Sequence, residues 1–90
     1  MLKLTVSGQY KRDHKTILKR SWNVESLKTV FDVLLNEEAL ARKYHDHELS
    51  GNYVGYRECH IESDWLLIYK VADRQLKLQR TGSHPSCSIR

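Results

Sequence analysis

Residues that can transfer protons or bind anions gather near the expected ends of strands in the second half of the chain: His45, Asp46, His47, Arg57, His60, Asp64, Trp65, Arg80 and His84. In an antiparallel meander the end of one strand lies beside the start of the next, so we expect His60 and Asp64 to be neighbours. The path from Arg80 to His84 returns to the same region if the register allows. This would place imidazoles, a carboxylate, an arginine and an indole around one patch.

These side chains suit cleavage of a phosphodiester without a metal. A base takes the proton of a ribose 2′-hydroxyl, a cation stabilises the charge on the phosphate oxygens, and an acid protonates the leaving oxygen. Histidine transfers protons near neutral pH, arginine binds phosphate with two parallel hydrogen bonds, and an exposed tryptophan stacks on a splayed base. Each residue also has a structural interpretation: a hydrogen-bonded strand histidine, a turn carboxylate at Asp64, a core Trp65, or a surface ion pair at Arg80.

A metal site is the main chemical alternative. Zinc could be held by His45, His47, Cys59 and Cys87, but these residues show neither Cys-x-x-Cys nor His-x-x-x-His spacing. The chain also lacks a glycine-rich phosphate loop. We therefore predict no metal and no cofactor, with Cys59 as a buried strand residue and Cys87 as a thiol of the tail.

Apolar periodicity predicts the elements of the first half of the chain. Alternation over residues 2–6 indicates a strand, and Ser7 can cap a helix that follows it. That helix has the apolar stripe Tyr10, His14, Ile17 and Leu18. Asn23 is a second cap, before the strongest helical stripe of the chain, and Asn36 is predicted to cap a short third helix that ends near residue 42.

The second half changes to the period of strands. Residues 54–61, 64–69 and 75–80 read as three strands joined by short turns, and the middle one is apolar on both faces. The order of elements predicts one α+β domain over residues 1–90. Its two to three helices pack on one face of a small antiparallel sheet, formed by the N-terminal strand and a C-terminal three-strand meander.

Charge is concentrated near the N-terminus. Residues 1–45 hold nine lysines and arginines against five acidic residues, whereas residues 46–90 hold six of each. Most of the excess lies in a ten-residue stretch that contains Lys11, Arg12, Lys15, Lys19 and Arg20. A localised basic helix face suits a polyanion or an acidic protein, although a solvated surface is the simpler interpretation.

Composition limits the class of protein. Hydrophobic residues make up 40% of the chain and charged residues 29%, which is ordinary for a globular domain. No apolar run approaches the roughly 20 residues that span a bilayer, and the N-terminus lacks the apolar core of a signal peptide. We expect a cytoplasmic protein with reduced thiols and no membrane partner.

Four ordered blocks of the second half resemble a known family. They are DHELSG at 46–51, GYRECHI at 55–61, DWLLIY at 64–69 and RTGSH at 80–84. Together with the order of the elements, they make nearly the whole chain similar to the YafQ toxins of the RelE/ParE superfamily of toxin–antitoxin systems.

The resemblance implies an endoribonuclease that cuts mRNA on the ribosome. Family roles fall on His47, His60, Asp64, Arg80 and His84, with Trp65 beside them. His84 would be the general acid, Arg80 would bind the phosphate, and Asp64, His47 or His60 would be the base. Arg57 and the basic helix residues would add RNA contacts.

The resemblance also implies protein partners and leaves alternatives. A DinJ-like antitoxin with a ribbon-helix-helix segment would bind the toxin in a heterotetramer. The toxin would contact operator DNA only through this antitoxin. One alternative is a ParE-like toxin that acts on DNA gyrase, and another is a degenerate toxin that serves as a co-repressor. The degenerate-toxin alternative rests on the C-terminal residues 85–90. They contain no aromatic residue, although relatives commonly carry a Leu-Phe pair there.

Overall fold

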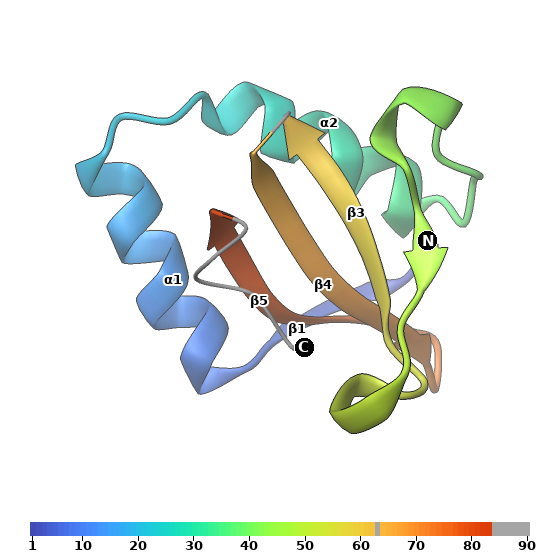
Figure 1. The fold of residues 1–90 in the computed structure, drawn as a ribbon. Helices are drawn as coiled ribbons and strands as arrows, with labels where there is room; N and C mark the ends of the chain where they lie inside the picture. Colours follow the sequence, from blue (N-terminus) through green and yellow to red (C-terminus); the bar gives the residue numbers. More distant parts are fainter. Residues whose placement is uncertain (63, 84–90) are drawn as a thin grey trace.

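A computed structural model describes residues 1–62 and 64–83 of the chain. It confirms the α+β class: two helices pack against a sheet of five strands (Figure 1). The elements are β1 (Lys3–Val6), α1 (Gly8–Lys19), α2 (Val24–Leu35), the 3₁₀ turn η1 (Arg42–Tyr44), β2 (His47–Glu48), the 3₁₀ turn η2 (Gly51–Tyr53), β3 (Arg57–Glu62), β4 (Trp65–Ala72) and β5 (Gln75–Ser83). Within the described residues, no helix is long and apolar enough to cross a bilayer.

Two of the three predicted helix caps are confirmed. The Ser7 hydroxyl accepts a hydrogen bond from the backbone N–H of Tyr10 at 2.9 Å. The side chain of Asn23 accepts one from the N–H of Glu25 at 3.0 Å. Each cap satisfies a backbone donor that the first turn of a helix leaves without a partner.

The predicted third helix is absent, because Asn36 ends α2 and does not begin another helix. Its backbone N–H and its side-chain amide both donate to the carbonyl of Asp32. The next residue, Glu37, has a left-handed backbone conformation with φ of 59°, which turns the chain away from the helix axis. Only the short turn η1 forms before β2.

The sheet has the order β1-β5-β4-β3-β2 and is mixed. The predicted antiparallel meander is confirmed in β3, β4 and β5, but β1 lies parallel to β5, contrary to the fully antiparallel sheet expected. The two-residue strand β2 was not predicted, and the strand expected from residue 54 begins only at Arg57, after η2. β5 extends to Ser83, three residues beyond its predicted end.

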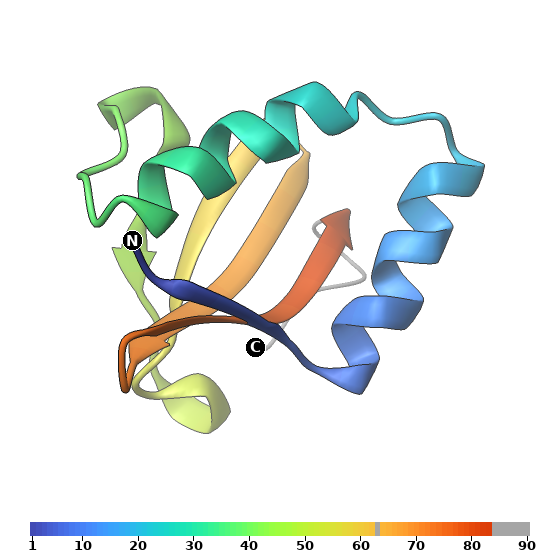
Figure 2. The same ribbon diagram turned by 180° about the vertical axis from the view of Figure 1, so that it is seen from behind.

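The two helices cover one face of the sheet. Figures 1 and 2 show α1 along the β5 side and α2 across the ends of β3 and β4. Ile17, Leu27 and Val30 of the helices pack with Leu67 and Tyr69 of β4 in the main core. Leu18, expected in the apolar stripe of α1, is instead half exposed, because α1 contacts the sheet through Tyr10 and Ile17.

Leu66 and Ile68 of β4 point to the other face of the sheet and form a second, smaller cluster. Side chains near β2 and η2, those of Leu49, Tyr53 and Tyr56, pack against them. The prediction that β4 is buried on both sides is therefore confirmed. We call this second side, away from the helices, the open face.

Candidate functional site

Strand register brings polar residues from three strands onto the open face. His47 of β2 lies opposite Glu58 of β3, Glu58 lies opposite Ile68 of β4, and Ile68 lies opposite Arg80 of β5. Directly opposed residues of antiparallel strands project to the same face of a sheet. His47 and Glu58 therefore lie on one side of Ile68, and Arg80 lies on the other.

His60 belongs to the next row of the open face. It lies opposite Leu66, which in turn lies opposite Gly82 of β5. Adjacent strands are about 4.8 Å apart, so β3 and β5 are separated by roughly 10 Å. Leu66 and Ile68 lie between His60 on one side and Arg80 on the other, and both are fully buried against Leu49, Tyr53 and Tyr56.

His47 is held at both ring nitrogens. Its Nδ1 lies 2.7 Å from the carbonyl oxygen of His45, and its Nε2 lies 3.2 Å from Oε1 of Glu58. A carbonyl only accepts hydrogen bonds, so Nδ1 donates, and Nε2 faces the Glu58 carboxylate. The carboxylate therefore occupies the side of the His47 ring from which Nε2 would reach a substrate hydroxyl.

Glu58 was missed by the sequence analysis, although its position carried a signal. It is two residues before His60 on the same strand, and residues two apart on a strand share a face. Its side chain is nearly buried, and a buried carboxylate requires a hydrogen-bonding or charged partner. His47 provides that partner.

The sequence analysis placed His45 among the polar residues near the strand ends and considered it as a zinc ligand, without giving it a role in the cleavage chemistry. In the structure its ring stands edge-on to the ring of His60, with centroids 5.4 Å apart. Both line a groove of about 1110 Å³ between α2, η1, β2 and β3, which His47 also lines. β2 pairs only with Arg57 and Glu58, so the groove lies where the outer edge of β3 is not covered by a strand.

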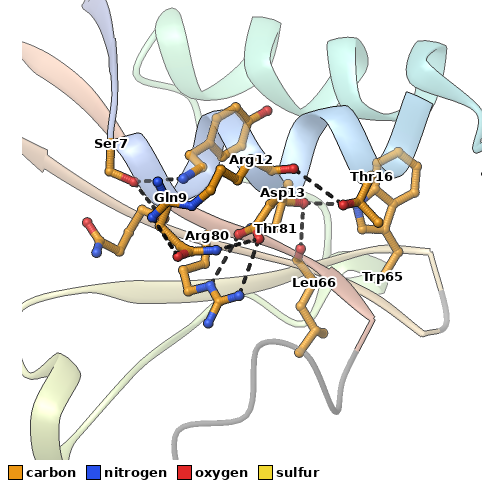
Figure 3. A network of polar contacts seen from close by, with 11 residues as sticks. Ser7, Gln9, Arg12, Asp13, Thr16, Trp65, Leu66, Arg80 and Thr81 are labelled. Carbon is orange, nitrogen blue, oxygen red and sulfur yellow. Dashed lines mark hydrogen bonds and ion pairs between the residues drawn. The ribbon is translucent and has the colours of Figure 1, made fainter. Parts of the chain in front are cut away.

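Arg80 is anchored to α1. Its Nε and Nη2 donate to the two carboxylate oxygens of Asp13, each at 3.2 Å (Figure 3). The same carboxylate accepts a hydrogen bond from the backbone N–H of Thr81. Asp64 is exposed and directly precedes β4, at the hairpin that joins it to the strand of His60.

The comparisons with known proteins identify the family. Residues 2–87 match the family model of YafQ, a bacterial toxin of type II toxin–antitoxin systems. The chain belongs to the YafQ toxin family. It is 44% identical to the mRNA interferase toxin YafQ of Escherichia coli over 79 residues, which cover 87% of this chain and 86% of that protein.

Solved structures of bacterial toxins share this fold. A copper-bound mutant toxin from Helicobacter pylori matches with a TM-score of 0.92 and 36% identity, covering 97% of this chain and 99% of that one. The toxin in the Escherichia coli DinJ–YafQ complex matches with a TM-score of 0.90 and 37% identity, covering 99% and 100%. These matches agree with the predicted family and order of elements.

Arg57 and Trp65, both expected to bind substrate, are not on the open face of this YafQ family member. Arg57 precedes Glu58 and so projects to the opposite face, where its Nε donates to Asp46 at 3.2 Å. Asp46 also accepts a hydrogen bond from the Tyr69 hydroxyl at 2.6 Å. The hydrogen bond to Asp46 raises the pKa of the Arg57 guanidinium. The same contact links β3 to the loop that contains His45 and His47.

Trp65 is a core residue, so the prediction that it stacks on RNA is wrong. It is only 2% exposed, its ring packs 5.1 Å from that of Trp22, and its indole N–H donates to the Thr81 hydroxyl at 2.9 Å. Figure 3 shows Trp65 and Leu66 pointing to opposite sides of the strand. This alternation assigns Trp65 to the helix-covered side of β4.

The burial of Trp65 gives a stability prediction. Replacing Trp65 with phenylalanine removes the donor to Thr81, and we expect the free energy of unfolding to fall by about 1–3 kcal/mol. Urea unfolding followed by circular dichroism measures the change. The cleavage rate of the folded variant should stay within about twofold of the parent, and a large loss of activity with unchanged stability would contradict the core assignment.

The other predicted residues fall into three groups. The basic residues predicted on the first helix are all exposed: Lys11, Arg12, Lys15 and Lys19 of α1, and Arg20 at its C-cap. His84 and Cys87 lie outside the described residues. Cys59 is buried among the helix-facing residues, and this burial raises the pKa of its thiol.

The described parts of the chain, 1–62 and 64–83, hold no cluster of three metal-ligating side chains. Cys59 in particular lies on the face opposite to that of His47, because Glu58, next to it in β3, faces His47. The zinc set considered from the sequence is therefore not assembled around Cys59.

Proposed function

We propose that this protein is an mRNA interferase: a toxin that cuts mRNA on the ribosome by attack of a ribose 2′-hydroxyl on the adjacent phosphodiester. The observation that carries the proposal is the strand register, which places His60 and the His47–Glu58 pair on one side of the buried residues Leu66 and Ile68, and Arg80 on the other. The Escherichia coli relative is named as an mRNA interferase, which supports the same chemistry.

In the proposed mechanism His60 removes the proton of the 2′-hydroxyl, and the oxygen attacks phosphorus to give a 2′,3′-cyclic phosphate. Arg80 stabilises the negative charge that develops on the phosphate oxygens. His84, assigned by resemblance to the family, donates a proton to the departing 5′ oxygen. Asp64 is the alternative base at the same hairpin. The His47 ring, held between the His45 carbonyl and Glu58, is a further polar group beside the attacked phosphate.

The deciding experiment follows cleavage of mRNA on programmed ribosomes and of the same mRNA without ribosomes. We expect cleavage only on ribosomes, and none when the nucleotide 5′ to the cut carries a 2′-deoxy sugar. Cleavage of the 2′-deoxy substrate would exclude the mechanism. Inhibition of gyrase-dependent supercoiling without RNA cleavage would support the ParE-like alternative instead.

A second arm of this experiment tests metal independence, because the Helicobacter pylori relative binds copper. The toxin is dialysed against EDTA and then transferred to EDTA-free ribosome buffer, which preserves the ribosome. We expect an unchanged cleavage rate. A loss that copper restores would show that a metal takes part.

The exposed lysines of α1 are proposed to bind ribosomal RNA. Lys11, Lys15 and Lys19 recur every fourth residue and so lie along one side of the helix. Changing all three to alanine should weaken ribosome binding and reduce the slope of log affinity against log salt by about 2–3, because fewer counterions are released. A control that neutralises Lys3, Lys28 and Lys77 removes the same charge elsewhere. Equal effects of both triple variants would contradict this assignment.

We also propose a DinJ-like acidic antitoxin as the cytoplasmic partner, since the Escherichia coli relative is solved in complex with DinJ. The net charge of +4 favours an acidic protein, which would cover the open face and exclude RNA. On co-expression, we expect the product of the adjacent gene to co-purify with this chain and to relieve growth arrest. Persistent arrest with a co-purifying partner would show that the partner leaves the open face accessible.

A further inference from the structure

The carboxylate of Asp13 on α1 accepts hydrogen bonds from three residues, Gln9, Arg80 and Thr81. Oδ1 accepts from Nε2 of Gln9 at 3.0 Å and from Nη2 of Arg80 at 3.2 Å. Oδ2 accepts from Nε of Arg80 and from the backbone N–H of Thr81, both at 3.2 Å (Figure 3). The side chain is only 10% exposed, so these contacts are shielded from water.

Asp13 lies beside the part of the β5 edge that no strand of the described residues pairs with. The pairing between β1 and β5 ends at Val6 and Leu78, so β1 does not reach Thr81. Asp13 accepts the hydrogen bond of the Thr81 N–H that would otherwise face outward without an acceptor. Together with the bond from the Ser7 hydroxyl to the carbonyl of Gln79 at 2.8 Å, this contact fastens α1 along the edge.

We propose that Asp13 is the positioning residue of Arg80. The two parallel bonds fix the plane of the guanidinium and its rotation about the long side chain. This inference rests on the proposed function, in which Arg80 binds the attacked phosphate. A phosphate clamp depends on geometry, because bidentate bonds form only when the guanidinium plane faces the phosphate oxygens.

Charge alone argues for the opposite outcome. A carboxylate beside Arg80 reduces the positive potential at the phosphate, so its removal should strengthen RNA binding if Asp13 had no other effect. The gain from orientation is expected to exceed this cost, since small misplacements of a catalytic group reduce rates by up to about 100-fold. The orientation of Arg80 affects the maximal cleavage rate, whereas its charge affects RNA binding and so the half-saturating concentration. Measuring both quantities separates the two effects.

The test is single-turnover cleavage of ribosome-bound mRNA by Asp13→Asn. The amide keeps an oxygen that can accept from Thr81 but loses the second acceptor and the charge. We expect the maximal rate to fall about 10–100-fold, with the half-saturating concentration changed by less than about twofold. Asp13→Glu, which restores the carboxylate, should recover part of the rate. Gln9→Ala removes a bond to the same carboxylate without touching Arg80 and should leave the rate within about twofold.

A double-mutant cycle separates positioning from a purely structural role. If Asp13 acts through Arg80, Asp13→Asn should change the residual rate of Arg80→Ala by less than about twofold. A parental or faster rate for Asp13→Asn, or an equal loss in the Arg80→Ala background, would overturn the proposal.

Positioning can also be measured without RNA or a variant. The Nε–H group of Arg80 in the parent protein should give a sharp NMR signal that exchanges slowly with solvent. A fast-exchanging or averaged signal would refute positioning even if Asp13→Asn failed to fold. Because this readout needs no cleavage, it also separates failure of this inference from failure of the proposed ribonuclease function.

Discussion

Alanine at position 60 should lower the single-turnover rate of mRNA cleavage by about 10²–10⁴-fold, the usual cost of losing a general base or acid. The expectation follows from the open face, where His60 lies beside Leu66 and its ring meets that of His45 at the groove. His47 is less suited to replace it, because both of its ring nitrogens already contact the protein, Nδ1 at the His45 carbonyl and Nε2 at Glu58. Rates are measured with toxin in excess over programmed ribosomes, across a pH series.

The pH series distinguishes a base from a structural histidine. If His60 is the base, the rise of the parent rate with pH should disappear in His60→Ala, whereas a loss of packing would lower the rate at every pH by the same factor. His14→Ala is the matched control, since His14 lies on α1 and contacts Tyr10. If Asp64→Asn, and not His60→Ala, removed the pH dependence, the base would be Asp64.

Removal of the arginine on β5 should have the second largest effect. Arg80→Ala is expected to lower the maximal cleavage rate by about 10²–10³-fold, comparable with the loss of one donor that stabilises a transition-state anion. Arg80→Lys should recover only part of the lost cleavage rate, because an ammonium group cannot make two parallel hydrogen bonds to a phosphate. Ribosome affinity should change much less than the maximal rate, since the negative charge is greatest in the transition state.

Folding must be checked in the same variants. Arg80→Ala leaves the nearly buried carboxylate of Asp13 without its cationic partner, so some loss of stability is expected as well. The rate is therefore compared at a temperature where thermal unfolding shows the variant to be folded. Arg74→Ala, at an exposed position in the turn between β4 and β5, is the control for loss of one positive charge. A folded Arg80→Ala protein that cleaves at the parental rate would exclude Arg80 from the chemistry.

The sequence alone determined the helices and the meander. Ser7 and Asn23 cap the helices as predicted, because a cap is a contact between residues two or three positions apart. Alternating and helical apolar periods likewise depend on neighbours along the chain. The same local logic failed at Asn36, whose residue type suits either end of a helix, and only the left-handed backbone at Glu37 showed that it ends α2.

Only the tertiary structure decided which polar residues share a face with one another. Alternation separates Trp65 from Leu66, but the packing of α1 and α2 determines that the face of Trp65 is the covered one. Glu58 becomes part of the candidate site through its register with His47, and Asp13 through a contact between residues 67 positions apart. Such pairings depend on which surfaces the helices bury and on how strands align, and neither is encoded in the spacing of residues along one element.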